Sequence, residues 1–203
     1  MPDYDFFRLQ KRVAKELDEA RFEHTLGVMY TCAALAMAHG YDIDDARCAG
    51  LLHDCAKCIP TKKKLKLCED YYVPITDFEK SHPFLIHAKL GAALAREKYG
   101  VTDEQILSAI TYHTTGRPEM TLLEKIVYIA DYIEPMRTKA PNLDRIRPLA
   151  FRNLDECMYE ILKDTLAYLS DNPQDVDLTS LKAYNYYLAL HNSRKYTSRA
   201  SQS

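Results

Sequence analysis

An adjacent imidazole and carboxylate, His53 and Asp54, end the apolar run 49–52. Burying two such polar groups is costly unless they are paired with other groups or bind a cation. Because histidines and an aspartate recur at helix-sized intervals on both sides of this pair, we interpret the whole set as a metal site. The candidate ligands, which share imidazole or carboxylate chemistry, are His24, His53, Asp54, His87, His113 and Asp131.

These four imidazoles and two carboxylates suit iron, manganese or zinc, whereas calcium and magnesium prefer sites made only of oxygen atoms. Six ligands are too many for one tetrahedral ion that must also keep a position open for chemistry. We therefore expect two divalent ions. One carboxylate then has to bridge them, and Asp54 is the candidate because it is adjacent to one imidazole and central in the sequence.

Other histidines and cysteines are weaker candidates for ligands. His82, just before Pro83, competes with His87, but His87 falls inside an apolar stripe of helical period and is preferred. Cys55 and Cys58 have a CxxC spacing, which without a second pair is weak support for zinc. We interpret the six cysteines as reduced, mostly buried small hydrophobic residues.

The order of the candidate ligands, H…HD…D, resembles that of the HD-domain metal-dependent phosphohydrolases. The first histidine, the HD pair and the last aspartate match this motif, and the two intervening histidines match the members with binuclear sites. Four local sequences are similar to the YqeK-type branch, the bacterial symmetrical bis(5'-nucleosyl)-tetraphosphatases: RFEHTLGV, LLHDCAK, HTTG at 113–116 and ADYIEPMR at 130–137. The resemblance covers about residues 22–137 and continues more weakly to about residue 191.

This resemblance implies a ligand set and an activity. His24, His53, Asp54 and Asp131 would hold one iron, and Asp54, His87 and His113 would hold the other; manganese or another divalent transition metal is the alternative to iron. Members of this branch cut diadenosine tetraphosphate into two molecules of ADP, so we expect a dinucleoside polyphosphate as substrate and ADP as product. We hypothesise that a hydroxide between the two ions attacks an inner phosphorus in line and displaces ADP without a covalent enzyme intermediate.

Several further side chains are expected to contact the substrate. Lys57, one helical turn beyond the HD pair, and Arg137 are expected to bind phosphate oxygens, and we assign catalytic roles to Asp54 and Lys57. Thr114, Thr115 and Gly116 form a turn that would present hydroxyl and amide groups to the same substrate. Glu134 is expected to orient a neighbouring group or to bind a ribose hydroxyl.

Other functions fit the same ligands. HD-fold di-iron oxygenases use a nearly identical set, so the ligands alone do not separate hydrolysis from oxidation, and the sequences at 113–116 and 130–137 favour the hydrolase. A nucleotide-sensing module that turns its ligand over slowly is a third hypothesis, and hydrolysis of another nucleotide is the nearest variant of the first. The lysine-rich run 62–66 is either a solvated helix face or the rim of a polyphosphate cleft.

Helical periodicity dominates the chain, and no segment alternates with the period of a strand, so we predict an all-α, single-domain HD-domain helical bundle over residues 1–195 with a disordered tail at 196–203. The first expected helix runs over about 18–38 and stops at Gly40. Further helices are expected to start after Asp42 or Asp44, at Thr61 and after Pro83, the last of these ending at Gly100. Capping boxes at 102–105 and 121–124 each start another helix, and two more are expected at about 148–169 and 179–191.

Composition excludes some classes of partner. The chain has 203 residues, a net charge of −2 and 47% hydrophobic residues, so nucleic acid is not an expected partner because there is no positive excess to follow a phosphate backbone. The charged, amphipathic N-terminus is unlike a signal peptide, and no apolar run reaches the roughly 20 residues that span a bilayer. We expect a cytoplasmic protein with no membrane partner, whose exposed apolar faces on the late helices would permit a homodimer.

Overall fold

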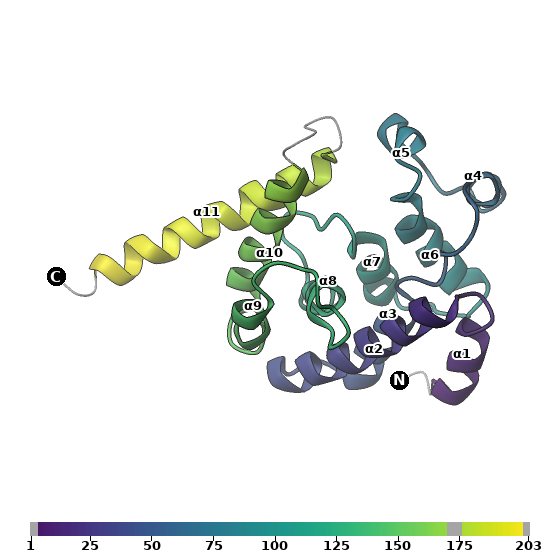
Figure 1. The fold of residues 1–203 in the computed structure, drawn as a ribbon, viewed down its shortest axis with the longest axis horizontal. Coiled ribbons are helices and arrows are strands. Elements are labelled where there is room, and N and C mark those ends of the chain that lie inside the picture. The colour runs from purple at the N-terminus through teal and green to yellow at the C-terminus, as the bar shows by residue number, and fades with distance from the viewer. Residues whose placement is uncertain (1–3, 170–175, 201–203) are drawn as a thin grey trace.

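Helices make up the regular structure of the part of the chain described by a computed structural model, residues 4–169 and 176–200, and no strand occurs in these ranges (Figure 1). The all-α prediction is therefore confirmed. In chain order the helices are α1 (Phe6–Val13), α2 (Glu19–His39), α3 (Ile43–Leu52), α4 (Thr61–Asp70), α5 (Asp77–Ser81), α6 (Ile86–Glu97), α7 (Glu104–Tyr112), α8 (Leu122–Ile133), α9 (Leu143–Ala150), α10 (Leu154–Leu169) and α11 (Leu178–Ala200).

The long helix α2 begins and ends at strong local signals. The Asp18 side chain accepts a hydrogen bond from the amide of Arg21, which satisfies one of the free donors of the first turn. The helix ends at Gly40, whose φ of 70° lies in the left-handed region that favours glycine. The predicted helix at about 18–38 and its predicted stop are both confirmed.

A close crossing of α2 and α3 forms one wall of the core. A Cβ atom at Gly50 would lie 2.9 Å from Cys32 Sγ and 3.0 Å from the Cα of Met29, so only glycine permits this approach. The same pair of helices contacts α8, and α3 also contacts α6 and α7. The largest apolar side chains of this core, which are fully buried, include Met29, Leu35, Leu51, Leu52, Ile86, Leu90, Ile106, Ile110, Leu123, Ile126 and Ile129.

The structure corrects one predicted helix start and confirms another. Helix α7 is capped by Asp103, which accepts from the amides of Gln105 and Ile106, so the helix does not begin with the capping box predicted at Thr102. The capping box from Thr121 to Glu124 is present as predicted. Aspartate and threonine are both favoured N-cap residues, so the local sequence alone does not decide between Thr102 and Asp103.

The helix predicted at about 148–169 is two helices. The chain turns after α9, and the Asn153 side chain then accepts from the amide of Glu156 at 3.1 Å at the start of α10. Pro148 lies inside α9 rather than at the start of a helix. Asparagine three residues before glutamate is a start signal that outweighs the continuous apolar pattern on either side.

Helices α9 to α11 pack on the side of α8 away from α6 and α7, and Figure 1 shows α11 projecting from the bundle toward the C-terminus. Helix α11 continues to Ala200, so residues 196–200 lie in a helix rather than in the irregular tail that we predicted, and 201–203 lie outside the described residues. Among the described helices, none combines the length and apolar character required to cross a bilayer.

Candidate metal centre

Six predicted ligands converge where the ends of α3 and α7 meet α2, α6 and α8. His24 lies on α2, His87 on α6 and Asp131 on α8, while the remaining three follow directly from the ends of two helices. His53 is the C-terminal cap residue of α3, with Asp54 next to it, and His113 is the cap residue of α7. The imidazoles of His53, His87 and His113 are at most 3% exposed, and Asp54 is 1% exposed.

The four imidazoles form a row. The ring centroid of His53 lies 5.6 Å from that of His24 and 5.0 Å from that of His113, and His113 lies 5.0 Å from His87. His24 and His87 are therefore the two ends of the row. Asp131 faces the first end, with its Oδ1 atom 3.0 Å from His24 Nε2 and 4.0 Å from His53 Nε2.

Asp54 is shared by three of the imidazoles. Its Oδ2 atom lies 3.5 Å from His53 Nε2, and its Oδ1 atom lies 3.1 Å from His87 Nε2 and 3.5 Å from His113 Nε2. Two groups of donor atoms within 4.8 Å of one another result, one of His24, His53 and Asp131 and one of His53, Asp54 and His113. Asp54 thus lies within reach of three imidazoles, and its role as the carboxylate that bridges two ions stays a prediction.

The chemistry of these donors fits divalent cations. His24 Nε2, His53 Nε2 and Asp54 Oδ1 are buried and have no hydrogen-bond partner among the described residues, although each has an ionisable neighbour at 3.0 to 3.5 Å. Buried polar atoms left without a partner are destabilising, and an ion that accepts their lone pairs removes that cost. Imidazole nitrogen and carboxylate oxygen are suitable donors for transition metals.

Hydrogen bonds from the other ring nitrogen orient each imidazole. Nδ1 of His53 donates to the carbonyl of Gly50, and Nδ1 of His113 donates to that of Ile110, both at 2.7 Å. His87 makes the same three-residue contact with the Phe84 carbonyl. In each case Nε2 is left to face the cluster, which is how metal-binding histidines are usually held.

The protonation states also suit metal binding. Burial lowers the pKa values of His53 and His87 to about 4, so both imidazoles are neutral near pH 7. Burial opposes ionisation of Asp54, but the neighbouring imidazoles outweigh it and hold the pKa of this carboxyl well below its usual range. Burial likewise disfavours protonated His24, yet the carboxylates of Asp131 and Glu134 raise its pKa.

The Glu134 carboxylate binds the Nδ1 side of the His24 imidazole, opposite the Nε2 atom that faces Asp131. The side chain is 1% exposed; its Oε1 atom accepts from His24 Nδ1 at 3.0 Å and its Oε2 atom accepts from the amide of Met136 at 2.6 Å. A Cβ atom at Gly27 would lie 2.5 Å from the same Oε2 atom, so a side chain there would displace the Glu134 carboxylate from this position. Of the two roles expected for Glu134, the geometry favours orientation of a neighbouring group.

Two arginines border the His24 end of the row. Arg137 Nη2 lies 2.8 Å from Asp131 Oδ1, and Arg21 Nη1 lies 2.9 Å from Asp54 Oδ2. Arg21 was not predicted. Its sequence signal was its place one helical turn before His24, which puts both on the same face of α2. A cavity of about 540 Å³ next to the site is lined by both arginines, His24 and Lys139.

The predicted substrate contacts divide into two groups. Lys57 Nζ lies 3.2 Å from His87 Nε2 and 3.7 Å from Asp54 Oδ1, and the Thr114 hydroxyl lies 3.1 Å from His113 Nε2, so both reach the cluster. The Thr115 hydroxyl instead donates to the carbonyl of Gly116. In the described part of the chain, neither Thr115 nor Gly116 has a hydrogen bond or ion pair with the six ligands, and Gly116 packs near Met120 and Tyr128.

The competing ligands lie elsewhere. His82 stacks on Phe78 at a centroid distance of 4.1 Å, whereas His87 contacts Asp54, in agreement with the preference for His87. Cys55 is buried against the carbonyl of Gly91, and burial raises the pKa of its thiol to about 12, while Cys58 is exposed. Among the described residues the two cysteines do not form a metal-binding group.

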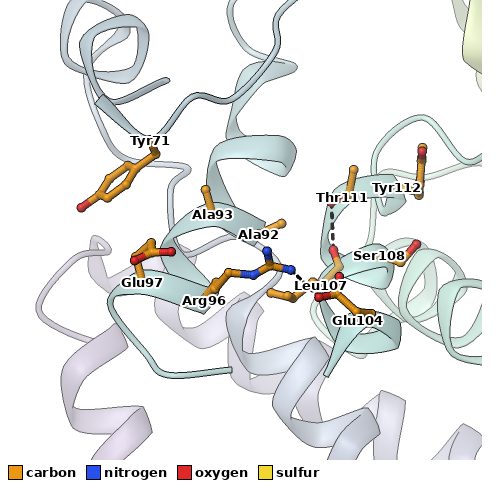
Figure 2. A pocket seen from close by; sticks show the side chains of 10 residues that line it. All are labelled: Tyr71, Ala92, Ala93, Arg96, Glu97, Glu104, Leu107, Ser108, Thr111 and Tyr112. Atoms are coloured by element: carbon orange, nitrogen blue, oxygen red, sulfur yellow. Dashed lines mark hydrogen bonds and ion pairs between the residues drawn. The ribbon is translucent and has the colours of Figure 1, made fainter. Parts of the chain in front are cut away.

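A second cavity lies away from the cluster. It has a volume of about 380 Å³, lies between α6 and α7 and contains none of the predicted site residues. Figure 2 shows Arg96 and Glu104 facing each other there, with Arg96 Nη2 and Glu104 Oε1 at 2.6 Å. Arg96 is therefore paired with Glu104, and the other charged group of the lining, Glu97, is a carboxylate, so the cavity offers no unpaired positive charge to a phosphate.

Comparisons with known proteins point to the same chemistry. The HD-domain family matches residues 21–136. The chain is 40% identical over 177 residues to a protein of Bacillus subtilis (strain 168) named "Bis(5'-nucleosyl)-tetraphosphatase, symmetrical", with 87% of this chain and 94% of the relative covered. A protein of the same name from Staphylococcus aureus (strain NCTC 8325 / PS 47) is 39% identical over 180 residues, with 87% and 92% covered.

A solved structure has the same fold. The crystal structure of a predicted HD superfamily hydrolase involved in NAD metabolism from Clostridium acetobutylicum is similar to this chain with a TM-score of 0.87. The two sequences are 36% identical, and the match covers 93% of this chain and 99% of the other. The likeness extends beyond the metal centre to nearly the whole bundle.

Proposed function

The chain belongs to the HD-domain family, and from this premise and the geometry of the metal centre we propose that it is a metal-dependent hydrolase that cleaves diadenosine tetraphosphate symmetrically into two molecules of ADP. The observation that carries the proposal is the convergence of three imidazoles on one shared carboxylate, that of Asp54, beside a second group of His24, His53 and Asp131. The names of the Bacillus and Staphylococcus relatives support the substrate and the symmetry of the cut.

Two divalent cations would be held by the six side chains. His24, His53, Asp54 and Asp131 would bind one, and Asp54, His87 and His113 the other. Bound cations of this kind supply a water of lowered pKa and neutralise phosphate oxygens. Iron is our prediction for the metal, with manganese as the alternative, because imidazole and carboxylate donors bind several divalent transition metals. A homodimer also stays a prediction.

The chain's own groups would hold the substrate for attack at an inner phosphorus. The bond between that phosphorus and the oxygen joining the two central phosphates breaks, water supplies the new oxygen, and ADP leaves on both sides. Arg21 and Arg137 already direct their guanidinium groups at Asp54 and Asp131. We assign them to phosphate oxygens, because guanidinium binds such groups with two parallel donors. Lys57 supplies a further positive charge at the His87 end.

Product identification tests the proposal. Protein purified without air is analysed for metal and incubated with diadenosine tetraphosphate, and the nucleotides are separated by chromatography. We expect ADP as the sole nucleotide product, two molecules for each substrate consumed. A mixture of AMP and ATP would mean attack at an outer phosphorus and would contradict the symmetrical cut.

The same assay separates the rival functions. Turnover that requires oxygen would identify an oxygenase, and tight binding of ADP with no turnover would identify a nucleotide-sensing module. Faster release of phosphate from mononucleotides than of ADP from the dinucleotide would identify a different nucleotide hydrolase. Each of these results overturns the proposal because a symmetrical tetraphosphatase needs no oxygen and acts on the central anhydride.

A further inference from the structure

Helix α8 ends at a proline, which leaves part of its main chain without the usual hydrogen bonds. The amide of Glu134 makes the last bond of the helix, to the carbonyl of Ala130 at 3.0 Å. Pro135 has no N–H group, so the carbonyl of Asp131 lacks the partner that a longer helix would give it. Arg137 Nε donates to that carbonyl at 3.0 Å. The end of α8 is thus completed by a side chain that lies beyond the helix.

Arg147 of α9 makes further contacts of this kind. Its Nε atom donates to the carbonyl of Ile133 at 3.0 Å, and its Nη2 atom donates to the carbonyls of Glu134 at 3.1 Å and of Arg137 at 2.8 Å. The side chain is half-buried, and among the described residues it has no ion-pair partner. The guanidinium group of Arg147 therefore holds the main chain of the segment 133–137.

This segment carries residues of the His24 end of the metal centre. Asp131 Oδ1 lies 3.0 Å from His24 Nε2, and Glu134 Oε1 accepts from His24 Nδ1 at 3.0 Å. The His24 imidazole is therefore held between two carboxylates that lie one turn apart at the end of α8. Arg137 also belongs to the segment, and its Nη2 atom donates to Asp131 Oδ1 at 2.8 Å. A displacement of the end of α8 would move both carboxylates relative to the same imidazole.

The His87 end of the centre is held in another way. Nδ1 of His87 donates to the carbonyl of Phe84, and Nδ1 of His113 donates to that of Ile110, so each ring is oriented by the chain that directly precedes it. In the part of the chain that the structure describes, Arg147 makes no hydrogen bond or ion pair with these residues. Loss of Arg147 should therefore disturb one end of the centre and spare the other.

We propose that Arg147 is a positioning residue that fixes the end of α8 and thereby sets the geometry of the His24 end of the metal centre. It acts through Asp131 and Glu134 rather than by binding a cation or the substrate itself. The inference rests on the proposed function, because it concerns one of the two cations assigned there. A planar guanidinium group can hold several carbonyl oxygens at once, whereas an ammonium group acts as a compact point charge.

Hydrogen exchange of the purified protein tests whether Arg147 holds the segment. Arg147→Met is compared with Arg145→Met, which removes the same charge from the same helix and breaks an ion pair to the buried Glu160 of α10. In Arg147→Met we expect the amides of 134–137 to exchange roughly tenfold to a hundredfold faster, as for the loss of a hydrogen bond to a charged group. Arg145→Met should leave these amides within about twofold of the wild type.

Metal binding by the same variants tests the consequence for the centre. Competition between the protein and a coloured chelator for Mn²⁺ measures the affinities of the two ions. We expect Arg147→Met to weaken one ion by roughly tenfold to a hundredfold and to leave the other within about twofold. Arg147→Lys should fall between Arg147→Met and the wild type, because an ammonium group replaces only part of the contacts. Arg145→Met should bind both ions as the wild type does.

Three results would overturn the inference. Exchange that rises equally throughout α8, α9 and α10 would mean that Arg147 contributes only to the stability of the whole bundle. Equal weakening of both ions would mean that it does not act on one end of the centre. Faster exchange of 134–137 with unchanged affinity for both ions would mean that the end of α8 does not set the geometry at His24.

The inference and the proposed function can fail separately. A wild-type protein that binds two ions but releases no ADP from diadenosine tetraphosphate refutes the proposed function, and the exchange and metal-binding comparisons still decide the role of Arg147. Conversely, an Arg147→Met protein that binds both ions and releases ADP as the wild type does refutes the role of Arg147 and leaves the proposed function standing.

Discussion

The buried carboxylate of Glu134 accepts a hydrogen bond from Nδ1 of His24 at a distance of 3.0 Å. His24 is the one imidazole of the cluster that a side chain orients in the described structure, since the imidazoles of His53, His87 and His113 donate to main-chain carbonyls. A carboxylate behind a metal-binding imidazole raises its basicity and fixes its ring orientation. The His24 end of the site therefore depends on Glu134 in a way that the His87 end does not.

Replacement of Glu134 should weaken metal binding at the His24 end. We expect Glu134→Ala to reduce metal affinity by about tenfold to a hundredfold, and Glu134→Gln to reduce it less, because the amide oxygen still accepts from Nδ1. Competition with a coloured chelator measures the affinity. The unfolding midpoint of the metal-free variants serves as the control, and a loss of affinity no greater than for a distant surface variant would contradict the role of Glu134.

Gly27→Ala should act through Glu134. The added methyl group would lie 2.5 Å from Glu134 Oε2 and would have to displace it. We expect a loss of metal affinity similar to that of Glu134→Ala, although Gly27 contacts no ligand directly. Because both changes disturb the same contact, the double variant should lose little more than either single variant. Additive losses in this cycle would show that Gly27 acts by another route.

Helical spacing was sufficient to predict that the six side chains meet inside the bundle, and their role as metal ligands stays a prediction. His24, His87 and Asp131 lie within apolar stripes, so a period of 3.6 residues directs them into the bundle. His53 and His113 both end a buried helix, and the same pattern directs them inward. Contacts between residues of different helices could not be predicted from the sequence, because they depend on how the helices pack.

The residues that were missed or misplaced all depend on such packing. Arg21 reaches Asp54 only because the end of α3 crosses the first turns of α2. Thr115 was assigned to the substrate with Thr114, but adjacent residues after a helix end point in different directions, and only Thr114 contacts the cluster.

Replacement of Asp54 and of Asp131 should have different effects on metal content. Asp54 contacts three of the four imidazoles and is assigned to both ions, so Asp54→Asn should lose both ions. Of the four imidazoles, Asp131 pairs with those of His24 and His53 in the described structure, so Asp131→Asn should retain the ion assigned to Asp54, His87 and His113. Metal analysis of dialysed protein measures the stoichiometry, and near-equal losses in both variants would argue against a shared carboxylate.

Acid should destabilise the metal-free protein through two buried imidazoles. His53 and His87 have pKa values of about 4 in the folded protein and 6.5 as free groups. Between these values the unfolded chain binds more protons than the folded chain, so the free energy of unfolding falls as the pH falls from 6.5 toward 4. The expected loss is about 3 kcal/mol for each imidazole, from 1.36 kcal/mol per pKa unit.

His24 does not change this slope, because the stabilisation from its raised pKa is fully present below about pH 6.5 and is lost only as the pH rises further. The lowered pKa values of Asp54 and Asp131 add a further loss only below about pH 4, where the unfolded carboxylates begin to take up protons. Urea unfolding of chelator-treated protein at pH 7, 6 and 5 measures the slope. His87→Gln should reduce the slope by about half, since one of the two buried imidazoles is then absent, and a stability independent of pH across this range would show that neither imidazole is held neutral by burial.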